Sequence, residues 1–220
     1  MEHHLIHLLV NMPWYQHGRP FEDWTVVVAA QGPSLIPEQV DEASHIFPTC
    51  VCKDVYMYAE NAKLIYACDR AWWHQRWRTD EALRKHKAVK VTLDYQKLDT
   101  KVPDLQWLKC GGNHGFIFEE GVVAHGRNTG HQLINLVVNM GAPRLILMGY
   151  DMRVLDGKTH CHDRHVPVPH TVFDDFYGAM MQAAPLLVKK GIKVINTSMR
   201  SRLTCFPKMP FNEALDWGRG

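Results

Sequence analysis

Several common features are missing from this chain, and long apolar runs are the first of them. A membrane-spanning helix needs about 20 consecutive apolar residues, whereas the apolar run at 5–12 is short and is interrupted by His7. No small-residue cleavage site follows that run, so we expect neither a secretory signal peptide nor a membrane anchor. We therefore expect a cytoplasmic protein without a membrane span.

The chain also has little net charge. Its 25 Lys and Arg residues nearly balance its 23 Asp and Glu residues, which gives a formal net charge of +2 with neutral His. Proteins that bind the phosphate backbone of nucleic acids usually carry a clear basic excess, so a nucleic-acid partner is not indicated. Because 46% of the residues are hydrophobic, the chain has enough apolar material to fold rather than to remain disordered.

No Cys-x-x-Cys pair occurs among the six cysteines, so a zinc site built from thiolates is not expected. The even number of cysteines is compatible with disulfides. However, a chain of this length buries enough surface to fold without them, and no secretory signal is present. We therefore expect buried free thiols.

Apolar runs alternate with helical patterns from residue 25 onward. Strands buried on both faces read as continuous apolar runs, and such runs predict strands at 25–30, 45–52, 64–68, 88–93, 144–148 and 193–195. Helical spacing of apolar residues predicts helices at 37–43, 69–78, 129–140 and 172–190, the last with a kink at Pro185. Strands that alternate with helices indicate parallel pairing.

We therefore expect an α/β protein with a single Rossmann-like three-layer domain and a mostly parallel sheet. The domain is placed at 25–207, with an N-terminal arm at 1–24 and a C-terminal tail at 208–220. Ligands of such folds bind outside the carboxyl ends of the strands. The residues that follow each predicted strand are therefore the candidates for a site.

Gly32, Pro33 and Ser34 follow the first predicted strand. A sharp turn there exposes backbone N–H groups that suit a phosphate, and Ser34 can donate to an anionic oxygen; a plain turn is the alternative. Asp69 follows the third predicted strand. It can hold a ribose hydroxyl or a metal ion, or it can simply cap the next helix.

Asn128, Thr129 and Gly130 open an apolar helix. Free N–H groups at a helix N-terminus favour an anion, although the Gly-Lys-Ser/Thr element of a Walker loop is missing from this turn. Asn128 or Thr129 is an N-cap candidate whether or not this helix start binds an anion. Further along, Gly149 allows a ligand to approach the backbone, and Asp151 is expected at the same rim, with a solvated loop acid as the alternative.

Four histidines, His160, His162, His165 and His170, fall within eleven residues. Histidine titrates near neutral pH and serves as acid, base or metal ligand. The prolines in this segment indicate a loop, which is expected to lie over the site. A solvated loop whose histidines fill polar niches is the alternative.

Taken in order, these motifs resemble one superfamily, over the segments 28–35, 66–69, 128–130, 141–151 and 191–196. One branch comprises the bacterial lipooligosaccharide sialyltransferases, which use a CMP-activated sugar. The other is the archaeal 6-hydroxymethylpterin diphosphokinase-like family, whose relatives include motility-associated glycosylation factors (motility accessory factor-related). The chain is also similar to small phage-encoded members, which would place it in a host cytoplasm.

The sialyltransferase branch implies that the residues at 32–34 and 128–130 hold a nucleotide and that Asp151 lies in the same pocket. It also implies a histidine of the loop as general base, with His162, His165 and His170 as the candidates. The chain departs from that branch at Gln31 and after the second strand, at Lys53, where the branch carries Asn. In that branch both positions bear on contacts with the nucleotide, so the two changes bear on whether the donor carries cytidine.

Our leading hypothesis is a transferase, and in particular a glycosyltransferase, that uses a nucleotide or nucleotide-sugar donor. A second hypothesis is a diphosphokinase that transfers pyrophosphate from ATP, with magnesium as cofactor held by Asp69 and Asp151. A third is a non-catalytic nucleotide- or protein-binding module, which the changes at Gln31 and Lys53 motivate. The acceptor is not identified, and a homo-oligomer that involves the N-terminal arm stays open.

Overall fold

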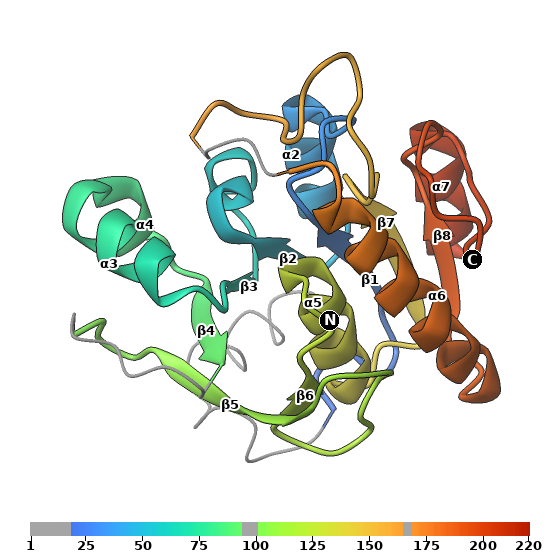
Figure 1. The fold of residues 1–220 in the computed structure, drawn as a ribbon, viewed down its shortest axis with the longest axis horizontal. Coiled ribbons are helices and arrows are strands. Elements are labelled where there is room, and N and C mark those ends of the chain that lie inside the picture. Colours follow the sequence, from blue (N-terminus) through green and yellow to red (C-terminus); the bar gives the residue numbers. More distant parts are fainter. Residues whose placement is uncertain (1–18, 94–100, 165–168) are drawn as a thin grey trace.

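The computed structural model describes residues 19–93, 101–164 and 169–220, which form one open sheet with helices on both faces (Figure 1). The strands in these ranges are Thr25–Ala29 (β1), Thr49–Cys52 (β2), Leu64–Tyr66 (β3), Val89–Leu93 (β4), Gln106–Gly112 (β5), Val122–Ala124 (β6), Arg144–Met148 (β7) and Lys193–Asn196 (β8). The central strand β1 is buried along its whole length. It is therefore apolar on both faces, as a strand covered from both sides must be.

The strands of the described residues pair in the order β6-β5-β4-β3-β2-β1-β7-β8, and each neighbouring pair is parallel. The chain starts at β1, builds the sheet outward to β6, and then returns to place β7 on the other side of β1. The strand order therefore reverses between β1 and β7. In open α/β sheets a crevice forms at such a switch point, outside the carboxyl ends of the strands.

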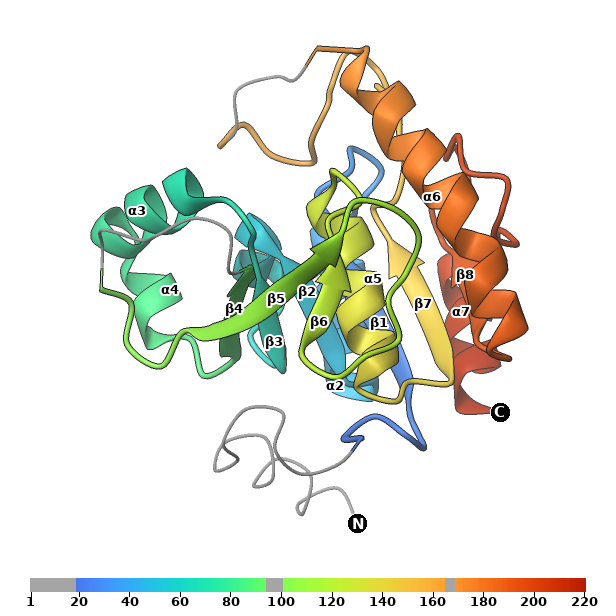
Figure 2. The same ribbon diagram turned by 60° about the horizontal axis from the view of Figure 1, so that its bottom comes forward.

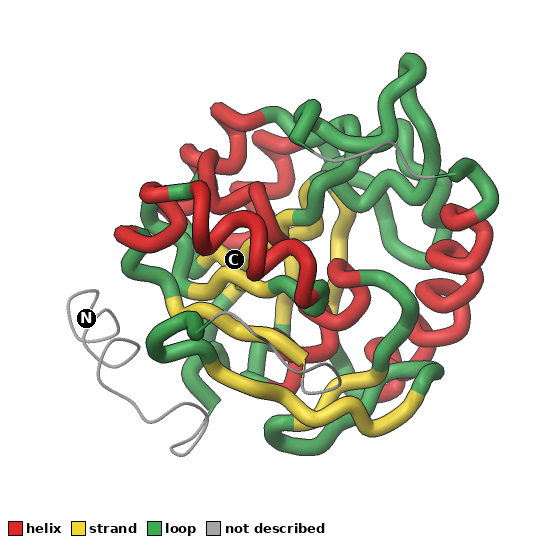
Figure 3. The backbone as a smooth tube through the Cα atoms, turned by 60° about the vertical axis from the view of Figure 1, so that its left-hand side comes forward, coloured by secondary structure: helices red, strands yellow, loops and turns green. Residues whose placement is uncertain are grey.

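Two layers of helices cover the sheet. The helical elements are α2 (Pro37–Ile46), the 3₁₀ helix η1 (Lys53–Tyr58), α3 (Arg70–Thr79), α4 (Glu81–Lys85), α5 (Thr129–Asn139), α6 (Val172–Lys189) and α7 (Phe211–Arg219). One face of the sheet packs against α5 and α6, through side chains such as Leu133 and Leu187. The other face packs against the remaining helices, through side chains such as Val40 and Trp73. Figures 2 and 3 show the strands between these layers.

The predicted α/β three-layer domain with a parallel sheet is confirmed. The strand predicted at 144–148 has the predicted bounds, whereas the strand predicted at 45–52 is wrong in its first part, because α2 continues to Ile46 and the strand begins at Thr49. The strands β5 and β6 and the helices α4 and α7 were not predicted. Pro185 lies inside α6.

Both ends of the described chain contribute to the core. Phe21, which falls in the predicted arm, is fully buried. The predicted tail at 208–220 contains α7, whose Phe211 and Leu215 pack against the sheet. Phe21 and the helix α7 are therefore packed parts of the fold.

All six cysteines lie in the described ranges and are free thiols, and Cys50, Cys52 and Cys68 are buried. No helix in the described part of the chain combines the length and the apolar character that crossing a membrane requires.

Candidate functional site

A pocket of about 240 Å³ lies at the switch point of the sheet. Its walls come from the segments that follow β1, β2, β3, β6 and β7 and from the first turns of α6, and Figure 2 shows the loop after β7 passing over this edge of the sheet. Segments far apart in the sequence meet here because parallel strands end at the same edge. The pocket brings together eight of the nine residues predicted to bind a nucleotide: Gly32, Pro33, Asp69, Asn128, Thr129, Gly130, Gly149 and Asp151.

Ser34 is the ninth predicted residue, and it supports Asp151 instead of lining the pocket. The Ser34 backbone N–H donates to Asp151 Oδ2 at 2.9 Å, and Ser34 Oγ donates to Ser198 Oγ at 2.8 Å. Asp151 is 1% exposed, and its Oδ1 has no hydrogen-bond partner within the described ranges. Burial raises the pKa of Asp151, although the Ser34 N–H favours its charged form. The pocket wall therefore carries a buried acceptor that a ligand O–H can satisfy.

The turns after β1 and β7 touch through their backbones. The Gly32 N–H donates to the Gly149 carbonyl at 3.0 Å. A Cβ at position 32 would lie 2.3 Å from both the Gly149 oxygen and Asp151 Oδ2, and Gly149 has a φ of +69°. Glycine is therefore required at both positions. A side chain at position 32 would push Asp151 out of place, and the Cβ of one at position 149 would lie 2.4 Å from the Ala30 carbonyl oxygen on a left-handed backbone.

The N-terminus of α5 forms another part of the wall. Asn128 is the N-cap, and its Oδ1 accepts the His131 N–H at 3.1 Å. Thr129 and Gly130 are the first two helical residues, and an α-helix has no internal acceptor for their N–H groups. Both residues line the pocket, so these amides and the positive end of the helix dipole are available to an anion.

Lys53 and Asp69 form an ion pair at the wall, with 2.5 Å between Nζ and Oδ2. Burial lowers the pKa of Lys53, but the neighbouring Asp69 outweighs it, and the pKa is raised overall. Asp69 precedes α3, yet in the described structure its side chain makes no capping hydrogen bond to that helix. The simple capping role is therefore wrong for Asp69, which is a polar group of the pocket.

The same ion pair argues against the magnesium that the diphosphokinase branch implies. Magnesium takes oxygen ligands such as carboxylates, and here the ammonium of Lys53 already occupies Oδ2 of Asp69. The described residues also contain no group of three or more His, Cys, Asp or Glu side chains that could hold a metal ion. Asp69 and Asp151 therefore do not fit a magnesium site.

Three residues of the wall have a left-handed backbone. The φ angles are +48° at Lys53, +55° at Arg127 and +51° at Met152. This conformation costs a residue other than glycine about 1 kcal/mol, and such strain gathers at ligand sites. The surrounding turns therefore hold these three residues in positions that relaxed loops would not adopt.

The structure places one of the described loop histidines at the pocket and the others away from it. His160 lines the pocket, whereas His162 does not: its Nε2 lies 2.6 Å from Gln31 Nε2. His170 is exposed, just before α6, and is not part of the wall, and His165 lies outside the described residues. The general-base role expected of His162, His165 or His170 stays a prediction.

Lys53, which the sequence singled out as a position that bears on the donor, lines the pocket, whereas His125 and Arg127 of the wall were not predicted. Phe173 and Phe176 in the first turns of α6 were not predicted there either, and their rings lie edge to face at a centroid distance of 6.1 Å. Phe176 also packs against the core. Helical spacing could not reveal that this end of α6 reaches the pocket as well as the core.

These features define a Rossmann-like α/β protein with a pocket at the switch point, where ligands of such folds bind. No family model and no curated protein matches the sequence. Among solved structures, the chain is similar to the sialyltransferase CstII from Campylobacter jejuni, in its complexes with the substrate analogue CMP-3FNeuAc and with cytidine-5'-monophosphate.

The TM-scores are 0.51 for the first complex and 0.54 for the second, each at 12% sequence identity. The alignments cover 84% and 86% of this chain, and 86% and 85% of those chains. At this identity the likeness shows a shared, sialyltransferase-like fold.

Proposed function

We propose that this protein is a glycosyltransferase that takes a nucleotide-activated sugar, with CMP as the nucleotide. The two similar structures are complexes of a sialyltransferase with CMP-3FNeuAc and with cytidine-5'-monophosphate. The likeness in fold supports a donor of the same class, and the pocket of this chain has the chemistry that such a donor needs.

The observation that carries the proposal is one pocket that combines two kinds of group. Thr129 and Gly130 offer helix N-terminal amides for a phosphate. Asp151 offers a buried carboxylate oxygen, without a partner in the described structure, that can accept a ribose or sugar hydroxyl. A nucleotide sugar presents both an anion and hydroxyl donors, so it satisfies both groups at once.

In the proposed reaction, an acceptor hydroxyl attacks the anomeric carbon of the donor. The bond from that carbon to the phosphate oxygen breaks, its electrons leave with the nucleotide, and the hydroxyl proton passes to a base. The dipole of α5 stabilises the charge that grows on the leaving phosphate. A positioned histidine base typically contributes about 10²–10⁴-fold in rate.

One of the loop histidines is the proposed general base. His160 is at the wall, and His162 and His170 are the described candidates expected from the sequence. Each histidine is replaced singly by Ala. Only the variant that lacks the base should lose kcat, by about 10²-fold or more, and its nucleotide affinity should change little. If neither these three variants nor His165→Ala loses turnover, a loop histidine is not the base.

Isothermal titration of the full chain with CMP, UDP, AMP and ATP tests the donor class. We expect CMP to bind with micromolar to millimolar affinity and to bind more tightly than the others. Absence of binding by every nucleotide at millimolar concentration contradicts the proposal. Binding of CMP without turnover of any CMP-sugar, in the presence of varied acceptors and of water, would favour the non-catalytic module.

A further inference from the structure

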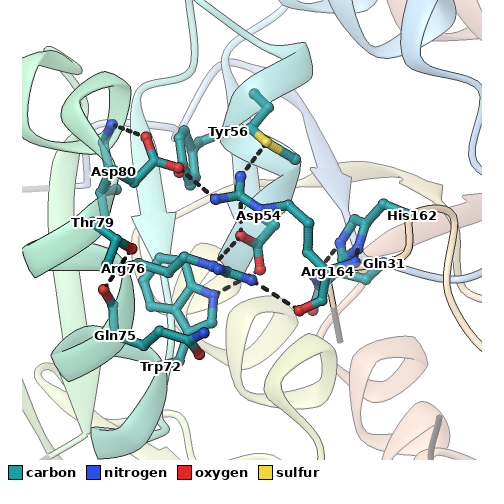
Figure 4. Close-up of polar contacts among 12 residues, drawn as sticks. Gln31, Asp54, Tyr56, Trp72, Gln75, Arg76, Thr79, Asp80, His162 and Arg164 are labelled. Carbon is teal, nitrogen blue, oxygen red and sulfur yellow. Dashed lines mark hydrogen bonds and ion pairs between the residues drawn. The ribbon is translucent and has the colours of Figure 1, made fainter. Parts of the chain in front are cut away.

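The last residues of the loop at 151–164, which follows β7, are joined to the body of the protein through Gln31 and through a charged cluster (Figure 4). The Cys161 N–H donates to the Gln31 carbonyl at 2.9 Å, beside the contact between the Gln31 and His162 side chains. Two residues further on, Arg164 reaches into a cluster of charged groups that comes from η1, α3 and the start of α4. Between the origin of the loop and these attachments lies His160, which lines the pocket.

The charged cluster is built around Asp54, which is 0% exposed. Its Oδ1 lies 2.7 Å from Arg76 Nε and 3.4 Å from Arg164 Nη1, and its Oδ2 accepts the Trp72 indole N–H at 2.8 Å. Arg164 Nη2 also donates to Asp80 Oδ2 at 2.6 Å. The guanidinium of Arg164 thus bridges two carboxylates of the body.

The backbone of the loop is fixed by the same cluster, because Arg76 donates to the Arg164 carbonyl at 2.9 Å. Among the described residues, the body contributes the carboxylates of Asp54 and Asp80 and the guanidinium of Arg76. The loop adds the second guanidinium, which balances the charge. A bridging arginine in a largely buried setting holds such a loop much more firmly than an exposed ion pair does.

We propose that Arg164 is a positioning residue that fastens the loop at 151–164 over the pocket and so holds His160 at the pocket wall. This inference rests on the proposed function only where it predicts a change in the affinity for the donor. The fastening itself is a property of the protein without ligand. Neutral Gln at position 164 would leave this stretch attached through the contacts of Cys161 and His162 with Gln31 and through the Arg76 contact to the backbone.

Hydrogen–deuterium exchange of the full chain without ligand tests the fastening. In Arg164→Gln, the amides at 159–164 should exchange about tenfold faster or more, while exchange in the sheet stays as in the natural protein. Arg164→Lys should be intermediate, because one ammonium cannot bridge both carboxylates. The matched control is Arg200→Gln, which removes the exposed ion pair of the same loop with Asp156 and should leave 159–164 unchanged.

Asp80→Asn provides a second, independent variant. Asn keeps the N-cap of α4 through its one oxygen, and its amide N–H can donate to the Tyr56 hydroxyl, which contacts the other oxygen of Asp80. It removes the charge that Arg164 bridges, so exchange at 159–164 should rise here too. Unchanged exchange in both Arg164→Gln and Asp80→Asn overturns the proposal.

Donor binding separates this inference from the proposed function. Arg164→Gln should weaken the affinity for a CMP-sugar about tenfold, and Arg164→Lys should restore part of it. If the natural protein binds no nucleotide, the proposed function fails, while the exchange experiment still decides the fastening. If exchange rises but the affinity for a donor that the natural protein binds is unchanged, Arg164 fastens the loop without positioning the site, and the positioning role is wrong.

Discussion

A buried carboxylate oxygen without a hydrogen-bond partner costs the folded protein free energy unless a ligand donates a hydrogen bond to it. Asp151 is such a group: burial raises its pKa, and one of its oxygens has no partner in the described structure. For an acid with a raised pKa, protonation favours the folded state. The contribution of Asp151 to stability therefore increases as the pH falls through its folded-state pKa.

Replacing Asp151 with Asn is expected to separate stability from binding. Asn can still accept the Ser34 N–H, and it removes the buried charge, so the free energy of unfolding at pH 7.5 should rise by about 1 kcal/mol. Nucleotide binding should weaken because the carboxylate that accepts a ligand hydroxyl is gone. Thermal unfolding and titration calorimetry on the same samples check both effects, and a variant that is less stable and binds as well as before would refute this role of Asp151.

His131 shows the opposite electrostatic behaviour. It lies in the first turn of α5, is 1% exposed, and stacks on Phe116 at a centroid distance of 4.5 Å. Within the described residues neither ring nitrogen has a hydrogen-bond partner. Burial lowers its pKa from the ordinary value of 6.5 to about 4, so the folded protein holds it neutral.

This lowered pKa predicts a loss of stability in mild acid. As the pH falls from 7.5 to 5, the unfolded chain takes up a proton at position 131 that the folded state excludes, which costs about 2 kcal/mol. His131→Leu has a similar volume and no titrating group, so it should lose that part of the pH dependence. Urea unfolding of both proteins at pH 7.5 and pH 5 measures the difference, and equal pH dependence would show that His131 is not held neutral.

Among the elements, α5 has two roles at its N-terminus, one structural and one proposed for binding. Its N-cap Asn128 satisfies the His131 amide, while the Thr129 and Gly130 amides lie at the pocket. The same first turn therefore starts the helix and forms the proposed anion site.

Two substitutions at Asn128 separate these tasks. Asn128→Ala removes the cap and should lower the free energy of unfolding by about 1 kcal/mol. Asn128→Asp keeps the cap, so stability should remain close to that of the natural protein, but its negative charge beside the phosphate should weaken nucleotide binding about tenfold. Chemical unfolding and calorimetry check the pair, and an Asp variant that binds CMP at full affinity would mean that no phosphate sits at this helix end.

Elements with strong patterns could be predicted from the sequence, and those with weak patterns could not. The strands β1 and β7 are continuous apolar runs because both faces are covered. By contrast, β5 is largely exposed and mixes polar, apolar and glycine residues, and β6 has only three residues, so neither carries a distinctive pattern. The helix α7 is short and follows a proline-rich stretch, and its place in the fold depends on packing against the sheet.

At the scale of the whole molecule, the pocket follows from topology. Once the strands are parallel, the turns that contain Gly32, Asp69 and Asp151 must share one edge, which is why the sequence could predict most of the wall. The loop after β7 could not be placed in this way. Its position depends on long-range contacts of Cys161 with Gln31 and of Arg164 with Asp80. In the resulting arrangement His160, and not His162, lines the pocket.

The measurement that tests the central claim most directly is a crystal structure of the full chain with bound CMP. We expect the phosphate within hydrogen-bond distance of the Thr129 and Gly130 amides, with a hydroxyl of the nucleotide on Asp151 or toward it. A nucleotide bound elsewhere on the molecule, or a pocket that stays empty in crystals soaked at millimolar CMP, would contradict the account.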